Sequence, residues 1–244
     1  MRHRRRIACW RSSLLAAAVM AVLVAPNPAS AAHAKARVFP PGAHPYGQSY
    51  SQWAADWWTW VLTQPAAVNP LLDPTGANCA QGQSGRVWFL VGTFGGGTAT
   101  RSCTVPKGTA LLFPVLNSFS GATRTDPPEQ QTEAFQRLQV TPPMRAATDL
   151  RASIDGVAVS NIKERYFEES VVFRVVLPAD NIFGVNRLCE PSMTPEAGCV
   201  VFPTVDAGYY LMVKPLKPGT HTIHFTGTAA FGTVDVTYTI TVVK

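Results

Sequence analysis

The sequence predicts a mainly β fold: an antiparallel β-sandwich, immunoglobulin-like or jelly-roll-like, with a tryptophan-rich N-terminal helix packed on it. Apolar and polar residues alternate strictly over 233–243, which indicates a strand with one buried and one solvated face. Asp155-Gly156 separates two alternating segments and is typical of a β-hairpin turn. A helical pattern that holds four of the six tryptophans precedes these strands, at 49–64.

Residues 1–32 have the three parts of a secretory signal peptide. A basic start is followed by an apolar run at 14–25 and by small residues at 29–31. The run of about 12 residues is shorter than the ~20 that span a bilayer, so we expect no integral membrane segment after signal cleavage. Cleavage after Ala32 or Ala34 also fits the pattern. The sequence therefore predicts an exported protein that is secreted or extracellular.

We expect an extended, proline- and glycine-rich lead-in at 33–48 and one mainly β domain at 49–244, because no linker divides the remainder. The signal segment contains five of the 21 basic residues and none of the 15 acidic ones, which leaves the mature chain with a net charge of +1. No basic cluster remains that would follow a phosphate backbone. The composition therefore gives no indication of nucleic-acid binding.

Four cysteines remain in the mature chain, and an even number in an oxidising compartment predicts two disulfides. The cysteines are Cys79, Cys103, Cys189 and Cys199. Of the three pairings, Cys79 with Cys103 and Cys189 with Cys199 are favoured because each closes a short local loop.

The sequence indicates no metal site and no cofactor. Structural zinc sites commonly use a C-x-x-C pair, which the mature chain lacks. His221 and His224 are three residues apart on a predicted strand, so their side chains should point to opposite faces.

The helix at 49–62 has a clear beginning and end. Ser49 and Gln52 form a capping box, and Pro65 disfavours helical geometry in the residue before it. On a helical wheel the polar residues occupy one narrow stripe and the apolar residues cover the rest. We therefore expect the helix to be buried on several sides. Trp58 is expected to be its least buried tryptophan because it lies beside Ser51 on the wheel.

The next elements are a turn-rich loop and three strands. The strands are predicted at 86–93, 101–105 and 109–116, with the glycines at 95–97 as a turn that lets the second strand return beside the first. Pro114 interrupts the third strand and indicates an edge or a bulge.

A helix is predicted at 129–139, with Ala134, Phe135 and Leu138 on its apolar face. Further strands are predicted at 150–154, 157–162, 170–177, 208–214, 220–226 and 233–243. Residues 206–210 also match the D-x-G-x-Y spacing of a tyrosine corner.

The chain resembles a family of uncharacterised exported bacterial proteins in five motifs: YGQSYSQWAADWW, NPLLDPTG, CAQGQSGRVWFLVGT, VPKGTALLFPVLN and KPLKPGTHTIHF. These motifs are spread over most of the mature chain. The resemblance implies a secreted bacterial protein, and it implies no activity, substrate or site residue.

The sequence alone leaves open whether the protein is an enzyme. It lacks the G-x-S-x-G elbow of serine hydrolases. A hydrolase of a carbohydrate or similar polymer needs two carboxylates roughly 5 to 9 Å apart, and Asp56 with Asp73 is the pair that we nominate as catalytic in that case. The alternative roles are a solvated helix residue for Asp56 and a turn residue before Pro74 for Asp73.

A ligand-binding role is indicated by aromatic residues. Trp57, Trp58 and Trp60 supply flat surfaces on which sugar rings stack, although burial worth ~1.5 to 3 kcal/mol each makes a place in the core the favoured explanation. Asn117 ends an apolar strand and is either a cap or a ligand-binding residue. The sequence therefore favours a secreted or envelope-associated binding or structural module, with an extracellular glycan or cell-envelope component as partner. The alternative is a secreted hydrolase.

Overall fold

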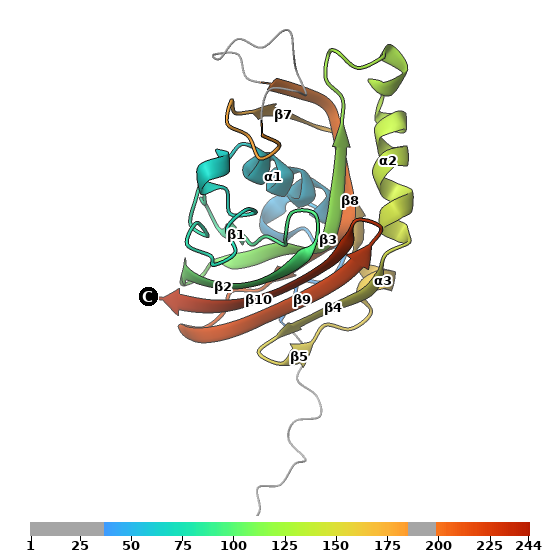
Figure 1. The fold of residues 1–244 in the computed structure, drawn as a ribbon. Coiled ribbons are helices and arrows are strands. Elements are labelled where there is room, and N and C mark those ends of the chain that lie inside the picture. The colour runs from blue at the N-terminus through green and yellow to red at the C-terminus, as the bar shows by residue number, and fades with distance from the viewer. Residues whose placement is uncertain (1–36, 185–198) are drawn as a thin grey trace, which may run out of the picture. The chain divides into compact units, whose positions relative to one another are not determined.

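The computed structural model describes residues 37–184 and 199–244, which belong to one compact unit, Lys35–Lys244. The predicted signal peptide and Cys189 lie outside the described residues. The protein is mainly β, as predicted, and its strands form two sheets (Figure 1).

The first sheet has the strand order β1-β3-β8-β6, and β7 also pairs with β8. Its strands are β1 (Val87–Phe89), β3 (Ala110–Gly121), β6 (Phe167–Glu169), β7 (Phe173–Leu177) and β8 (Cys199–Val213). The second sheet has the order β2-β10-β9-β4-β5. Its strands are β2 (Gly97–Pro106), β4 (Thr148–Ile154), β5 (Val157–Ala158), β9 (Gly219–Ala229) and β10 (Gly232–Val243).

Both sheets are mixed, which differs from the purely antiparallel arrangement that the sequence predicted. Strand β1 pairs with β3, and β2 with β10, in parallel; the other pairings are antiparallel. The predicted return of 101–105 beside 86–93 is wrong, because β1 and β2 lie in different sheets. The three glycines at 95–97 all have positive φ, and this backbone carries the chain across from one sheet to the other.

The helices are α1 (Tyr50–Leu62), α2 (Glu133–Arg145) and α3 (Ile162–Arg165), with short 3₁₀ turns at Pro45–Gly47, Ala66–Val68 and Pro128–Gln130. The capping box of α1 is present: the Ser49 side chain accepts from the Gln52 backbone N–H, and the Gln52 side chain accepts from the Ser49 N–H. Part of the predicted lead-in is an edge segment, since Val38 forms a bridge with Val213 at the end of β8.

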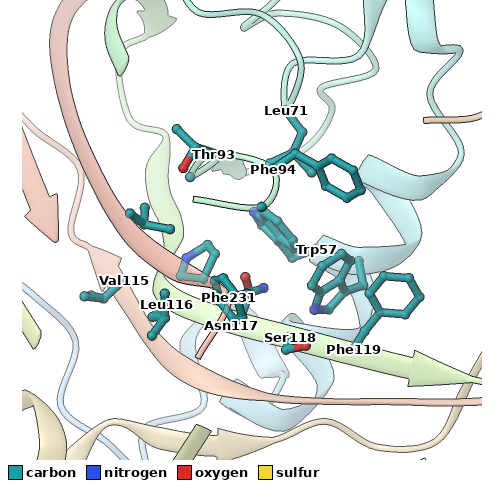
Figure 2. A pocket seen from close by; sticks show the side chains of 15 residues that line it. Trp57, Leu71, Thr93, Phe94, Val115, Leu116, Asn117, Ser118, Phe119 and Phe231 are labelled. Atoms are coloured by element: carbon teal, nitrogen blue, oxygen red, sulfur yellow. The ribbon is translucent and has the colours of Figure 1, made fainter. Parts of the chain in front are cut away.

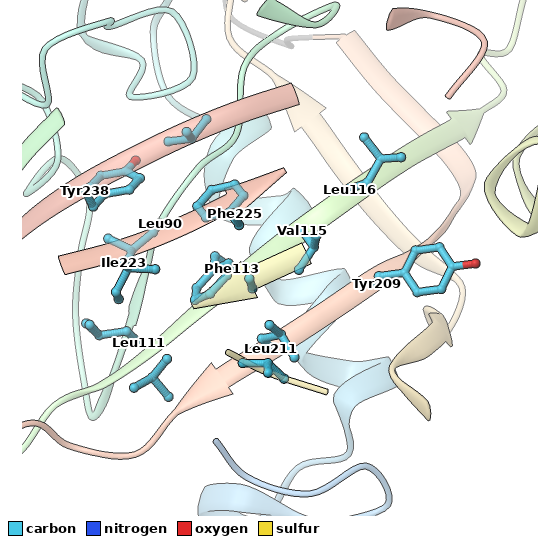
Figure 3. Close-up of a cluster of buried hydrophobic side chains, with 14 of the residues drawn as sticks. Leu90, Leu111, Phe113, Val115, Leu116, Tyr209, Leu211, Ile223, Phe225 and Tyr238 are labelled. Carbon is cyan, nitrogen blue, oxygen red and sulfur yellow. The ribbon is translucent and has the colours of Figure 1, made fainter. Parts of the chain in front are cut away.

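Strands β3 and β8 are buried on both faces because they lie between α1 and the second sheet. In β3, Leu111 and Phe113 belong to the hydrophobic cluster between the two sheets, whereas Ala110 and Leu112 belong to the cluster around α1. Figure 3 shows the intersheet cluster, to which Phe225 of the second sheet also belongs. Double burial explains why 109–116 reads as a continuous apolar run.

Several local predictions are confirmed. Strands β4 and β5 pair Ile154 with Val157 around Asp155-Gly156, and both turn residues have positive φ, as this hairpin turn requires. The register of β3 against β8 shifts between Pro114 and Leu116, so Pro114 marks a bulge. Strand β10 buries its apolar residues from Val234 to Val242 at every second position.

The predicted apolar face of the second helix is wrong. Helix α2 buries Gln136, Val140 and Met144, while Leu138 is 68% exposed. The helix begins after Thr132, which caps it, and its last turn continues through two prolines to Arg145. This extension puts Met144 in the intersheet cluster and turns a different stripe inward.

The predicted disulfide Cys79–Cys103 is confirmed and closes a sequence separation of 24 residues. Cys199 is disulfide-bonded, but the predicted partner Cys189 lies outside the described residues. In the described part of the chain, helices long and apolar enough to cross a membrane are absent.

Candidate functional site

A pocket of about 180 Å³ opens where α1 faces the bulged middle of β3. The other walls come from residues 92–95 and from Phe231 and Val234 at the start of β10. Figure 2 shows Trp57, Phe94, Phe119 and Phe231 around this space. Among the described residues, Asp, Glu, Lys, Arg and His are absent from the lining.

The aromatic wall has a buried floor and an exposed rim. Trp57 and Trp58 are 1% and 5% exposed, and their rings meet edge to face with centroids 4.9 Å apart. Phe119 lies against Trp58 at a centroid distance of 4.4 Å. Phe94 and Phe231 are 46% and 41% exposed. The floor is therefore rigid core, whereas the rim offers aromatic surface to a ligand.

The expectation that Trp58 is the least buried tryptophan of α1 is wrong. Its ring nitrogen Nε1 donates to Asp206 Oδ2 at 2.7 Å, which gives the indole a polar partner in the interior. Trp53 is the half-buried one, and its Nε1 donates to the Pro45 carbonyl at 3.0 Å. The helical wheel correctly predicted that Asp56 lies on the exposed polar stripe of α1. It could not predict that β8 supplies Asp206 as a buried partner for Trp58.

One polar residue of the lining, Asn117, belongs to a chain of hydrogen bonds that continues into the protein interior. Asn117 lines the pocket, and its Nδ2 donates to the Tyr210 hydroxyl at 2.8 Å. Tyr210 in turn donates to Asp206 Oδ2 at 2.9 Å. Asn117 pairs across the sheet with Gly208, where an added Cβ would come within 2.5 Å of the Asn117 Cβ. Glycine therefore allows β8 to approach Asn117 closely.

Asp206 is fully buried, and burial raises the pKa of its carboxyl group to about 8, against the opposing effect of hydrogen bonds from Trp58 and Tyr210. Its second oxygen, Oδ1, has no hydrogen-bond partner among the described residues. Arg137 is linked to the backbone of Asp206 through Ser170: its Nη2 donates to the Ser170 carbonyl, and the Ser170 Oγ accepts from the Asp206 N–H.

The structure places the other nominated residues away from the pocket lining. Trp60 donates from Nε1 to the Gln81 carbonyl at 3.0 Å and packs on Phe89. Asp56 is exposed on α1, and partial burial raises its pKa, opposed by a hydrogen bond from Gln48.

Asp73 organises its own loop. Its carboxylate accepts from the backbone N–H groups of Thr75 and Asn78, both at 2.8 Å. Burial raises the pKa of Asp73, but these hydrogen bonds outweigh burial and lower it overall. The turn-forming alternative for this residue therefore matches its observed contacts.

Asp206 and Tyr210 were not nominated as site residues from the sequence. Residues four apart on a strand share a face, but this spacing alone does not predict that the two side chains meet or that they are buried. Both residues belong to the D-x-G-x-Y match at 206–210, but a tyrosine corner bonds backbone, whereas the Tyr210 hydroxyl donates to the Asp206 side chain in its own strand.

A second hollow of about 390 Å³ lies beside the first, and Phe119 lines both. Its polar lining includes Thr123 and Asp126, which are bonded to each other through Asp126 Oδ2. These groups are already satisfied, so this hollow offers less to a ligand than the pocket at Asn117.

Within residues 37–184 and 199–244, groups of three or more His, Cys, Asp or Glu side chains arranged to hold a metal ion are absent. His221 contacts Asp155, and His224 contacts Asp235. Comparisons of the chain with protein-family models, with curated proteins and with solved structures find no match.

Proposed function

We propose that the protein is a secreted or envelope-associated binding module that takes a neutral, hydroxyl-bearing ring, as found in extracellular glycans, into the pocket between α1 and β3. The observation that supports this most is the pairing of two exposed phenylalanines, Phe94 and Phe231, with the Asn117 amide on one small pocket. Exposed aromatic groups beside a few polar ones are typical of ligand sites.

The lining favours a neutral ligand. Burying a charge without a partner is costly, and the described residues that line the pocket include no charged side chain to compensate for that cost. Three polar side chains, Thr93, Asn117 and Ser118, are present to receive hydroxyl groups. The volume of about 180 Å³ is below the ~300 to 1,000 Å³ of pockets that hold drug-sized molecules, so a single ring or the end of a chain fits best.

The alternative, a secreted hydrolase, receives less support. Carbohydrate hydrolysis by acid and base needs two carboxylates at one cleft. Asp56 is on the exposed stripe of α1, Asp73 is committed to its loop, and Asp206 is fully buried behind Trp58. The carboxylates of the described residues therefore give this pocket no such pair.

Export and the finer fold type belong to the same proposal. Secretion rests on the signal-like residues 1–32, and a bacterial envelope origin rests on the motif resemblance. That the two sheets form a sandwich of immunoglobulin-like or jelly-roll-like type stays a prediction. Ligand binding in the pocket depends on neither choice.

The proposal is tested by NMR titration of the mature protein with the methyl glycosides of glucose, galactose, mannose and N-acetylglucosamine. We expect at least one to bind, and Phe94→Ala combined with Phe231→Ala to weaken it by about tenfold or more, since each ring contributes apolar contact. Phe202→Ala is the matched control, because Phe202 is 54% exposed and does not line the pocket. Equal losses in both variants, or no binding of any glycoside, would refute the proposal.

A further inference from the structure

We propose that Tyr210 and Asp206 are positioning residues that hold the Asn117 amide with Oδ1 available to the ligand, so that the pocket selects rings that donate a hydroxyl hydrogen there. This inference rests on the proposed function, because it specifies which ligands the pocket prefers. The observation behind it is the chain Asn117–Tyr210–Asp206–Trp58.

The direction of this chain follows from its last member. An indole N–H can only donate, so at 2.7 Å from Trp58 Nε1 the Asp206 Oδ2 acts as an acceptor. A tyrosine hydroxyl has one hydrogen, and Tyr210 uses it toward the same Oδ2. The Tyr210 oxygen is then left to accept, and only the Nδ2 edge of the Asn117 amide can donate to it.

The protonation state of Asp206 does not reverse this direction. When the carboxyl group is neutral, its proton can sit on Oδ1, which has no hydrogen-bond partner among the described residues. Oδ2 then stays an acceptor for Trp58 and Tyr210 in both states.

The atoms of the Asn117 amide that remain without a hydrogen bond determine which ligand groups the pocket prefers. Asn117 lines the pocket, and no donor in the described part of the chain bonds its Oδ1. One Nδ2 hydrogen also remains. A hydroxyl group both donates and accepts, so it satisfies either atom, whereas a fluorine or ether at the same place leaves Oδ1 unpaired. An unpaired acceptor inside a filled pocket should lower affinity by roughly tenfold, which corresponds to about 1.4 kcal/mol.

The first arm of the test needs no ligand. Hydrogen exchange of the Asn117 side-chain amide is followed by NMR in the wild type, in Tyr210→Phe and in Tyr209→Phe. Tyr209 is the matched control, because its hydroxyl donates to the Met144 carbonyl on the other side of the sheet. We expect slow exchange in the wild type and in Tyr209→Phe, and exchange at least about tenfold faster in Tyr210→Phe. Equal exchange in all three proteins overturns the proposal.

The second arm uses the tightest methyl glycoside and its monodeoxyfluoro analogues, which lose one hydroxyl donor each with little change in size. In the wild type and in Tyr209→Phe, one analogue should bind about tenfold more weakly than the parent. In Tyr210→Phe the amide is free to turn, and this gap should shrink below about threefold. Binding without any donor preference overturns this inference and leaves the proposed function standing. Absence of binding by every glycoside overturns both.

Discussion

Both faces of the first sheet are buried, but the buried polar groups on the two sides have different hydrogen-bond partners. On the side toward the second sheet, buried polar side chains of both sheets donate to backbone carbonyls: Tyr209 of β8 donates to Met144, Tyr238 of β10 to Val91, and Arg101 of β2 to Asp73, Val91 and Gly92. On the face toward α1, the polar chain ends on a carboxylate that has one oxygen unpaired among the described residues.

This difference separates structural from functional polarity. Backbone carbonyls are fixed acceptors. A buried side chain that donates to them satisfies both groups and leaves no hydrogen-bonding atom for a ligand. Burial of a carboxyl group with one oxygen unpaired lowers stability. Its presence behind Asn117 fits a role in holding the pocket's amide. The predictions below test whether the two faces differ in this way.

The largest effect is expected on the intersheet face. Phe225 is fully buried and stacks on Phe113 with centroids 4.7 Å apart. Phe225→Ala should lower the free energy of unfolding by ~3 to 5 kcal/mol, because it leaves a cavity in a packed core. Denaturant melts measure this directly. A loss under about 1 kcal/mol would mean that the two sheets are packed more loosely than the contacts indicate.

The next effect concerns the disulfide that joins the loop before β1 to strand β2. Reducing Cys79–Cys103 opens a closure of 24 residues and should remove about 3 kcal/mol of stability on the chain-entropy model. The double variant Cys79→Ser with Cys103→Ser should melt earlier by a matching amount in the absence of reductant. Stability that is insensitive to both changes would contradict the role of this disulfide.

A pH-dependent effect is expected on the α1 face. The pKa of Asp206 is raised to about 8 in the folded protein, above its ordinary value of 3.8. Between these values the unfolded chain loses the proton that the folded chain keeps, so stability from this group falls as pH rises from about 4 to about 8 and then levels off. Asp206→Asn should remove that slope. Melts of both proteins across this range should show the variant gaining relative to the wild type, and parallel profiles would contradict the assignment.

The smallest stability effect is expected at the rim. Phe94 and Asp56 are both exposed, and Phe94→Ala or Asp56→Ala should change the free energy of unfolding by no more than about 0.5 kcal/mol. Phe94→Ala should nevertheless weaken glycoside binding, whereas Asp56→Ala should not. A large stability loss at Phe94 would show that its ring is structural, and a binding loss at Asp56 would reopen the hydrolase alternative.

Local signals in the sequence predicted much of the framework. The capping box at Ser49, the Asp155-Gly156 turn, the bulge at Pro114 and the alternation of β10 depend on nearest neighbours, and each is present in the structure. Pairing partners depend on contacts far apart in the chain. The parallel pairing of β2 with β10 was therefore missed, because the glycines at 95–97 fit a hairpin and a crossover equally well.

The candidate site shows the same limit. Trp57, Trp58 and Asn117 were nominated, and the structure brings them to one pocket, whereas Trp60 faces Gln81. Asp206 was not nominated, because a lone aspartate in a strand has no local pattern that marks it as buried. Its partner Trp58 lies 148 residues away in sequence, and only the packing of α1 on β8 brings the two together.

The most direct test of the central claim uses the indole N–H signals of the tryptophans in a two-dimensional ¹⁵N–¹H spectrum. We expect the tightest methyl glycoside to shift the signals of Trp57 and Trp58, which line the pocket. The signal of Trp88 should stay unchanged, because its Nε1 donates to the Cys79 carbonyl and its side chain does not line the pocket. Shifts confined to Trp88 or Trp60, or no shift at saturating glycoside, would contradict the claim that this pocket is the binding site.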